Sequence, residues 1–422
     1  MLQERLRKGP FIPVADAQEA LFARLRVRET QEIPLASALG HVLAEDIRAP
    51  RDVPPFDRSL QDGFALRSED VPGELRVVEE LPAGSFPTRP LRRGEAARVM
   101  TGAPVPPGAD AVVPFEIVDF PLGSVGRKGE TIVLSEAVPR EFKVQRKGSD
   151  FPAGTNVLRA GTRIGAAELA ALSALGFSHI RVYRKPSVAV LSTGEELRNP
   201  PEDLSPAEIY DANGPFLVGL LAERGFPVRY AGRVPDRMQD IVRRARELLQ
   251  DVDVLVTSGG VSVGDTDIVP FAAEAADLEV VFRWVAMRPG KSTTAAVAPD
   301  GAKLWLALHG NPAAAYVAAH LFLLPALCRL SGETTPLPER HLAVLRGAPG
   351  IRETGGPIPY PLTQYYRGKL RWEGTTPVVD AARIQLSPYI SSFLDSDVLV
   401  EIPHDRTVGE GDLVHVVRTA CR

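Results

Sequence analysis

The segment Val252–Pro270 limits what this chain can fold into more than any other stretch. It opens with the apolar run VDVLV, which is typical of a strand buried on both faces of a parallel sheet. The run ends at Ser258, Gly259 and Gly260, where backbone without a Cβ atom can take positive φ and approach a ligand closely. A helix with a threonine or aspartate cap is expected to follow. This arrangement binds phosphate at the carboxyl edge of an α/β sheet, although a tight turn without a ligand gives the same pattern.

The same strand–turn–helix unit recurs through the part of the chain that begins near Lys185. Strand patterns alternate with helical ones and end in a long helix over Pro312–Leu330. The alternation predicts a three-layer α/β/α domain with a mainly parallel sheet covered by helices on both faces. Two further strand ends carry small turns, and three such turns at successive strand ends converge on one crevice, which favours a phosphate-containing ligand. These two turns consist of Ser192, Thr193, Gly194, Gly310, Asn311 and Pro312.

The rest of the chain falls into parts that differ in residue composition and in predicted secondary structure. With 422 residues the chain is too long for one ordinary core. Helical spacing predicts a helix over Val14–Arg28 and a second short one within Ile33–Ile47, whereas short β-type runs separated by Pro and Gly follow Arg48. The predicted parts are an extended helical linker domain (1–50 and 145–184), a small β domain (51–144), the α/β domain (185–332) and a C-terminal β-barrel or sandwich (333–422).

Composition excludes several classes of function. A net charge of −4 and a pI near 6.1 argue against a nucleic-acid partner. Two cysteines and seven scattered histidines offer neither a disulfide framework nor a zinc-binding spacing. The charged start lacks the apolar core of a secretory signal, and the longest apolar stretch, 313–328, is shorter than a membrane span and contains His320 and Pro325. We expect a soluble, cytoplasmic protein with no membrane partner.

Three segments outside the α/β domain carry more polar and aromatic residues than a plain loop needs. PPFDRSLQDGFALR presents Asp62, VMTGAPVPPGADAVV offers the hydroxyl of Thr101, and RKGSD sets two cations and Asp150 around one glycine. Each segment also has an ordinary interpretation without a functional role: these are, in the same order, a turn aspartate, a proline-rich β turn and a solvated charged loop.

The segment MRPGKST, Met287–Thr293, resembles the end of a phosphate-binding P-loop. The glycine that a P-loop requires five residues before Gly290 is Val285 here, so the P-loop motif is absent. Arg288 and Lys291 remain candidates for contacts to phosphate or another oxyanion.

Carboxylates at adjacent strand ends suggest a hard cation. Glu196 follows one predicted strand, and Asp265 and Asp267 follow the next. Mg²⁺ held by one or two carboxylates, substrate phosphate and water fits this set. The sequence has no nucleophile elbow and no GxGxxG fingerprint, which argues against a hydrolase or a dehydrogenase function.

With these segments in view, the chain resembles the MoeA family of molybdopterin molybdenumtransferases, which includes the E domain of gephyrin. PFDRSLQDGFALR is similar to the family's PFDNSAMDGYAVR, and RVMTGAPVPPGADAVV to its RIMTGAPVPxGADAVV. RKGSD, STGEEL, IYDANG, TSGGVSVGDTD, RPGK and GNP also match, in order, through the α/β domain. The resemblance runs from Val14 into the C-terminal β region.

The resemblance implies a four-domain homodimer with a MogA-like α/β domain. Such an enzyme inserts molybdate into adenylylated molybdopterin, uses a divalent cation and releases AMP. It implies catalytic roles for Asp62, Thr101, Asp150, Glu196, Asp267 and Lys291, with Glu196 and Asp267 holding Mg²⁺. It implies substrate binding by Ser192, Thr193, Gly194, Ser258, Gly259, Gly260, Ser262, Gly264, Arg288, Gly290, Gly310, Asn311, Pro312 and Arg367. Asp62 would reach the cleft from the other subunit, and other enzymes of molybdenum cofactor biosynthesis are expected partners.

The chain departs from the family pattern at several positions. His309 stands where the family's LPGNP has proline, Gln61 where methionine is usual and Ser149 where glutamate is usual. These departures leave open a paralogue with altered oxyanion choice, such as tungstate, and a scaffolding paralogue that binds molybdopterin without turnover. The adenylyltransferase step is a third alternative, against which the extra β domains argue.

Overall fold

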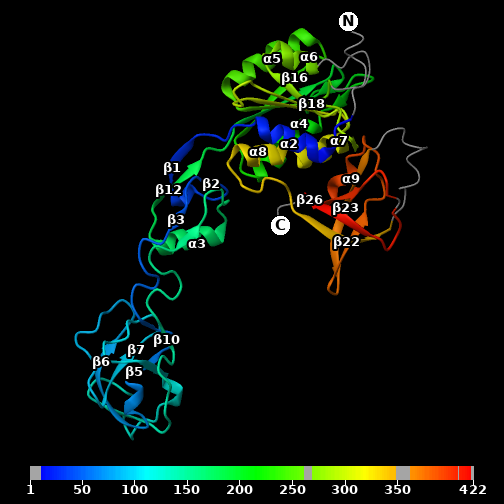
Figure 1. The fold of residues 1–422 in the computed structure, drawn as a ribbon. Helices are drawn as coiled ribbons and strands as arrows, with labels where there is room; N and C mark the ends of the chain where they lie inside the picture. The colour runs from blue at the N-terminus through cyan, green and yellow to red at the C-terminus, as the bar shows by residue number, and fades with distance from the viewer. Residues whose placement is uncertain (1–10, 261–268, 348–361, 407, 420–422) are drawn as a thin grey trace.

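The structure, a computed structural model, describes residues 11–260, 269–347, 362–406 and 408–419. It is elongated, with an α/β domain at one end beside a C-terminal β domain. A thin linker region leads from the α/β domain to a small β domain at the other end (Figure 1). The fold class predicted from the sequence is confirmed.

The α/β domain holds a six-stranded sheet in the order β16-β13-β17-β21-β20-β18. The first four strands are parallel, whereas β20 runs antiparallel to both of its neighbours, β21 and the edge strand β18. The strands are β13 Val188–Thr193, β16 Val228–Val234, β17 Val254–Ser258, β18 Glu279–Arg283, β20 Thr294–Val297 and β21 Leu304–Leu308, with a short pair β14 Leu197–Arg198 and β15 Ile209–Tyr210 beside them.

Helices cover both faces of this sheet because both faces of its strands are apolar. Alternate strand residues face two separate cores. One core holds α2 Val14–Arg24, α4 Asn213–Glu223 and the helical run of α7 Pro312–Ala318, η4 Ala319–Leu323 and α8 Leu324–Leu330; the other holds α5 Met238–Asp251 and α6 Val269–Ala275.

The run Pro312–Leu330 is the one helix among the described residues that is long and apolar enough to cross a membrane. Within its most apolar window, 89% is buried inside the fold. Burial against the sheet accounts for its composition.

The linker region is built from short strands and one helix. Its elements are β1 Thr30–Pro34, η1 Leu35–Ser37, β2 Val42–Leu43, β3 Ile47–Arg48, β11 Asn156–Leu158, α3 Ala166–Leu175 and β12 His179–Tyr183. The second short helix expected within Ile33–Ile47 is only the three-residue turn η1, because the residues on either side of it pair as β1, β2 and β3. The first helix also ends earlier than predicted, at Arg24, where Leu25 turns to extended backbone.

The small β domain is a five-stranded sheet in the order β8-β5-β7-β6-β9. Its elements are β4 Arg58–Ser59, β5 Gly63–Leu66, η2 Ser68–Asp70, β6 Gly73–Leu81, β7 Glu95–Val99, β8 Ala111–Pro114, η3 Phe115–Ile117, β9 Thr131–Leu134 and β10 Val144–Gln145. Side chains alternate along β5, so Phe64 and Leu66 enter one core and Ala65 the other.

The C-terminal domain is a closed barrel of five strands, because β23 pairs with both β24 and β25. Its elements are β22 Arg340–Arg346, β23 Thr363–Glu373, β24 Thr376–Ala381, α9 Ser391–Leu394, β25 Val398–Ile402 and β26 Leu413–Arg418. The two-residue strand β19, Met287–Arg288, leaves the α/β domain and adds to β23, which ties the barrel to that domain.

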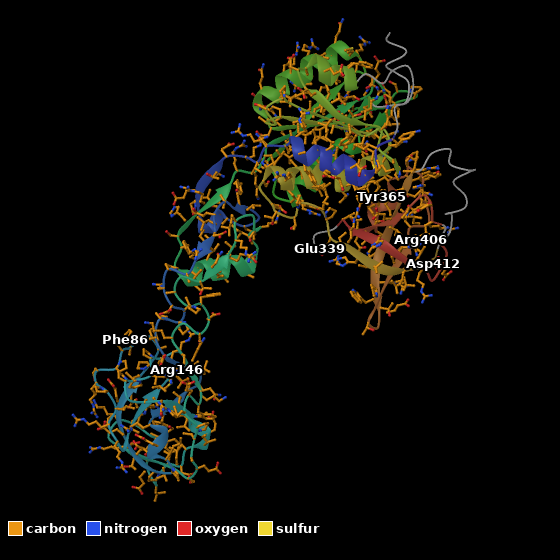
Figure 2. The ribbon with its side chains drawn as sticks, in the orientation of Figure 1. Phe86, Arg146, Glu339, Tyr365, Arg406 and Asp412 are labelled. Atoms are coloured by element: carbon orange, nitrogen blue, oxygen red, sulfur yellow. The ribbon has the colours of Figure 1, made fainter. Side chains whose placement is uncertain are left out.

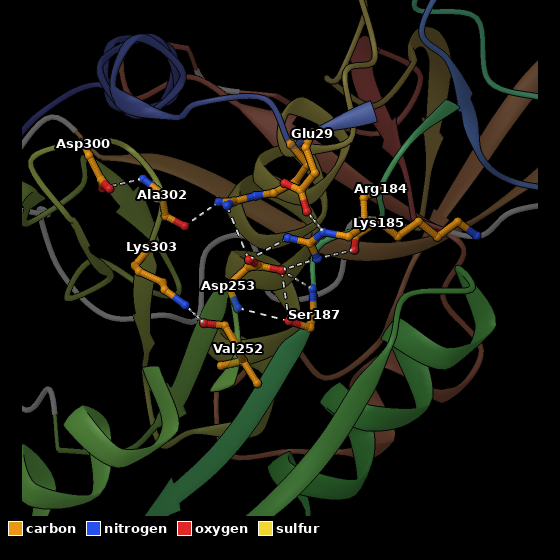
Figure 3. A network of polar contacts seen from close by, with 10 residues as sticks. Glu29, Arg184, Lys185, Ser187, Val252, Asp253, Asp300, Ala302 and Lys303 are labelled. Atoms are coloured by element: carbon orange, nitrogen blue, oxygen red, sulfur yellow. Dashed lines mark hydrogen bonds and ion pairs between the residues drawn. The ribbon is translucent and has the colours of Figure 1, made fainter. Parts of the chain in front are cut away.

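Both chain crossings between the linker region and the α/β domain converge on one carboxylate, Asp253, at the start of β17. Figure 3 shows Arg184 approaching it from one crossing, close to Glu29 of the other. Arg184 donates two hydrogen bonds to Asp253, at 2.8 and 3.0 Å, and Arg28 lies 3.3 Å from it. Burial raises the pKa of Asp253, but bonds from Arg184 and Ser187 outweigh it and hold the pKa at about 2. We call this network the linker joint.

Candidate active site

The three glycine turns predicted from the sequence meet at the carboxyl ends of β13, β17 and β21. The three strands are neighbours in the sheet, so their ends line one cleft of about 480 Å³. Of the predicted substrate-binding residues, Thr193, Ser258, Gly259, Gly260, Gly310, Asn311 and Pro312 line it, and so does Glu196. The expected convergence on a single crevice is confirmed.

Asp211 and Asn213, at the start of α4, hold the cleft in shape. Asp211 accepts hydrogen bonds from the buried Ser192 hydroxyl at 2.6 Å and from Tyr230 at 2.8 Å. Asn213 Nδ2 donates to Ser258 Oγ at 2.8 Å and to the Gly310 carbonyl at 2.7 Å. One buried amide thus links the ends of two strands, which pre-forms the cleft.

Gly259 sits where a side chain cannot. Its φ is +103°, and a Cβ atom there would lie 2.3 Å from the Thr193 carbonyl oxygen and 2.6 Å from Thr193 Oγ1. Thr193 Oγ1 is itself buried without a hydrogen-bond partner among the described residues. The turn therefore places bare backbone against the neighbouring strand end, as a close phosphate contact requires.

Carboxylates stand at the mouth of the cleft. Glu196 and Asp236 both line it, and both are solvent-exposed. The predicted metal ligand Asp267 lies outside the described residues, as do Asp265, Ser262 and Gly264. Within the described ranges, no group of three or more His, Cys, Asp or Glu side chains could hold a metal.

The segment MRPGKST runs beside the end of β21. Thr294 pairs with Ala307 in the sheet, so the preceding Lys291 lies near the start of the His309 turn. Gly290 takes φ +101°, and its carbonyl accepts hydrogen bonds from the backbone and hydroxyl of Thr293. Arg288 lies on β19 at the junction with the barrel. The segment predicted to contact an oxyanion therefore flanks the cleft.

His309 lines the cleft with an imidazole whose hydrogen bonding is defined. Its Nδ1 accepts the backbone N–H of Asn311 at 2.9 Å. Burial lowers its pKa, and the nearby charge of Lys291 lowers the pKa further. The ring is therefore neutral near pH 7, with its proton on Nε2.

The C-terminal domain supplies a further wall. Pro388 and Ile390 line the cleft, and Asn311 Nδ2 donates to Ser387 Oγ at 3.1 Å. Just beyond, Phe393 of α9 stacks on Tyr316 of α7 with ring centroids 4.8 Å apart. The barrel is thus docked directly at the cleft.

Arg367 lies beneath this wall and is fully buried. Its Nε donates to Ser392 Oγ at 3.2 Å, while Nη2 has no hydrogen-bond partner among the described residues. Burial lowers its pKa to about 10. A buried guanidinium with an unused donor is an uncompensated cation, which an anion would stabilise.

Asp62 and Thr101 are brought together, but not at the cleft. Asp62 Oδ1 accepts hydrogen bonds from both the backbone N–H and the hydroxyl of Thr101, each at 2.7 Å. These bonds, the backbone one first, lower the pKa of Asp62. The pair is solvent-exposed on the small β domain, which the linker region separates from the cleft (Figure 1).

Asp150 occupies a third place, where the small β domain meets the linker region. Figure 2 shows the adjoining Arg146 at this end of the domain. Arg146 pairs with Asp57 and Glu141, and the backbone N–H of Asp150 donates to the Val53 carbonyl at 3.0 Å. The contacts of RKGSD thus fasten the PPFD segment, and its arginine is already paired with two carboxylates.

Sequence reasoning missed Asp211, Asn213 and the wall from the C-terminal domain. An acid and an amide directly before a helix, as in YDANG, are a recognisable helix-start signal. The wall residues Pro388 and Ile390 carry no such signal, since their place follows from domain docking alone.

Family models match nearly the whole chain. Residues 12–176 match the MoeA N-terminal region (domain I and II), 189–329 match a "Probable molybdopterin binding domain", and 359–418 match the MoeA C-terminal region (domain IV). The fold and the cleft thus define a multidomain protein built around an α/β domain of the molybdopterin-binding class.

Individual relatives narrow this class. A molybdopterin molybdenumtransferase of Bacillus subtilis is 32% identical over 409 residues, covering 94% of this chain and 91% of that protein. One from Staphylococcus epidermidis is 37% identical over 320 residues, 74% of each. The solved MoeA protein of Pyrococcus horikoshii is 31% identical, with a TM-score of 0.75 over 97% of this chain and 99% of that one. The chain belongs to the MoeA family of molybdopterin molybdenumtransferases.

Proposed function

We propose that this protein transfers molybdenum from molybdate into adenylylated molybdopterin and releases AMP in a Mg²⁺-dependent reaction. The observation that carries the proposal is the cleft, where three strand-end glycine turns converge beside Lys291 and exposed carboxylates. Family membership supplies the reaction class. We place the activity in the cytoplasm.

The turns and the lysine suit the nucleotide part of the substrate. Backbone N–H groups at Gly260 and Gly310 can approach phosphate oxygens, and Lys291 adds a cation. The N–H of Gly259 is already used, since it donates to the Leu308 carbonyl at 3.1 Å. Asn213 holds two of the turns in register. These residues would bind and orient the phosphates before any bond changes.

Mg²⁺ would be held by Glu196 together with Asp267. The Glu196 carboxylate faces the cleft and, among the described residues, makes no side-chain hydrogen bond or ion pair, so it fits an ion that takes few protein ligands. When bound, Mg²⁺ neutralises charge on the phosphoanhydride.

Molybdate is a dianion and needs donors rather than carboxylates around it. Arg367, with its unused buried Nη2, and Arg288, on the strand that joins the two domains, support a molybdate site where the barrel meets the cleft. This assignment keeps the oxyanion away from Asp62.

Asp62 and Thr101 would act from the other subunit of a homodimer, because the linker region holds them away from the cleft of their own chain. Mixing two inactive variants tests this. After exchange of subunits, Asp62→Ala chains and Gly259→Ala chains would form heterodimers with one intact site, giving about a quarter of wild-type activity. A site within one chain would give no recovery.

The reaction itself is tested by AMP release. Purified protein is incubated with adenylylated molybdopterin, Mg²⁺ and molybdate, and AMP is quantified; absence of molybdate-dependent AMP would refute the proposal. Tight binding without AMP would identify a scaffolding paralogue. Formation of adenylylated molybdopterin from ATP and molybdopterin would identify an adenylyltransferase, and a parallel reaction with tungstate compares the two oxyanions.

A further inference from the structure

His309 is a departure with defined geometry. The family pattern has proline at this position, whose side chain offers neither a hydrogen-bond donor nor an acceptor. Here the imidazole lines the cleft between the β21 strand end and Gly310. The residue therefore adds a functional group to a wall that the family pattern leaves without one.

One nitrogen of this imidazole is already used. Nδ1 accepts the Asn311 backbone N–H at 2.9 Å, so it carries no proton in the neutral ring. The remaining proton is on Nε2, which makes no hydrogen bond to any described residue. The backbone bond also fixes the ring, so the donor is oriented before a ligand arrives.

The surroundings favour an anionic partner for this donor. Lys291 lies close enough for its charge to lower the pKa of the imidazole, in addition to the larger effect of burial. Backbone turns at Gly259 and Gly310 border the same space. A neutral N–H donor beside a cation and exposed backbone is suited to an oxygen of a tetrahedral oxyanion.

We propose that His309 is a substrate-contacting, specificity-determining residue, whose Nε2–H donates a hydrogen bond to an anionic oxygen bound in the cleft. This inference rests on the proposed function. The oxygen belongs either to a phosphate of the adenylylated pterin or to molybdate, which share this chemistry.

Two near-isosteric variants separate the donor from the structural bond. In His309→Asn the side-chain carbonyl can accept the Asn311 N–H as Nδ1 does, but no donor reaches the Nε2 position. In His309→Gln the amide places a donor near Nε2 and gives up the bond to Asn311. A structural role predicts damage from the glutamine, whereas a substrate-binding role predicts damage from the asparagine.

The experiment is calorimetric titration of wild type and both variants, first with adenylylated molybdopterin and Mg²⁺, then with sodium molybdate in the presence of AMP and Mg²⁺. Hydrogen bonds to charged groups predict about ten- to a hundredfold weaker binding for His309→Asn and a smaller loss for His309→Gln. Loss in the first titration assigns the contact to phosphate, and loss in the second alone assigns it to molybdate.

Wild-type affinity of His309→Asn in both titrations would overturn the inference, as would equal losses in the two variants. A wild-type protein that binds the pterin nucleotide but releases no AMP would refute the proposed function and leave this comparison intact. A wild type that binds neither substrate would refute both.

Discussion

Asp253→Asn should loosen the attachment of the linker region to the α/β domain. The side chain lies at the linker joint, where Figure 3 shows the polar contacts converging. Its carboxylate neutralises the charge of two guanidinium groups, those of Arg28 and Arg184. It also accepts hydrogen bonds from the backbone N–H and the hydroxyl of Ser187. Asparagine keeps the shape and part of the hydrogen bonding but removes the negative charge.

The size of the effect follows from burial and the pKa. The side chains of Arg28 and Asp253 are only 8% and 9% exposed. The pKa of Asp253 falls from an ordinary 3.8 to about 2, which corresponds to about 2–3 kcal/mol at roughly 1.4 kcal/mol per pKa unit. Breaking a buried pair by removing one partner typically costs about 3–5 kcal/mol. We expect a loss of about 2–4 kcal/mol in the free energy of unfolding of the α/β domain.

Urea denaturation measures this loss through the fluorescence of Trp284 and Trp305, both buried in the α/β domain. The matched control is Glu279→Gln, which breaks the pair with Arg24 on the same domain. Those side chains are 56% and 37% exposed, so the control should change stability by less than about 1 kcal/mol. An Asp253→Asn midpoint equal to that of the control would refute the reasoning.

The pH dependence of the free energy of unfolding provides a second test of the same prediction. The folded pKa of Asp253 is lowered, so its contribution is complete above about pH 4 and is lost as the pH falls toward 2. The stability difference between wild type and Asp253→Asn should therefore narrow across this window. A difference that stays constant down to pH 2 would show that the charge is not the cause.

Three further predictions concern the candidate site. Asp62→Ala should abolish AMP release at an unchanged unfolding midpoint, since the carboxylate is exposed; a matching loss of thermal stability would make the residue structural. Asn213→Ala should weaken pterin-nucleotide binding and cost about 1–3 kcal/mol in stability, because the buried Ser258 hydroxyl and the partly buried Gly310 carbonyl lose their donor; unchanged affinity by calorimetry would contradict this. Gly259→Ala should prevent nucleotide binding through the clash with Thr193, whereas Gly84→Ala, at φ +85° with open space around it, should leave binding intact; equal binding by both variants would exclude the close approach.

The sequence predicts most of the α/β domain because the pattern is local there. The run before Ser258 is buried along its whole length in β17, as an uninterrupted apolar stretch requires. The same holds in the linker region for helix α3, which spans Ala166–Leu175 between Gly165 and Gly176, with Gly176 at φ +90° at its end. An apolar run and a glycine that ends a helix act through local physical effects, so both can be recognised without knowledge of the rest of the chain.

Long-range pairing explains the failures. Residues Leu35–Leu39 have helix-forming composition, yet the segment before them pairs with β12, with Ile33 opposite Ile180. The strand β20, Thr294–Val297, is only four residues long and lies between β21 and β18 in the sheet. In both cases strand pairing, and not local preference, determines the structure.

The candidate site likewise has a part that local sequence predicts and a part that it does not. The strand-end turns could be located because a strand followed by glycine is visible locally. The roles of Asn213, which bridges to Ser258 and Gly310, and of Ile390, which arrives with the barrel, depend on contacts across the fold. Resemblance named the residues of the small β domain, but only the structure pairs Asp62 with Thr101 and separates both from the cleft.

The linker region determines how these separated parts can meet. A flexible tether would let Asp62 sample a wide volume at low effective concentration. Instead, the linker region pairs its strands over five residues and has its own apolar core, and both of its crossings are tied at Asp253. Such an arm restricts where the Asp62–Thr101 pair can lie relative to the α/β domain. If the pair completes the cleft of a second subunit, that subunit must lie where the arm points, so the ion pairs of the linker joint fix the geometry of a site that they do not touch.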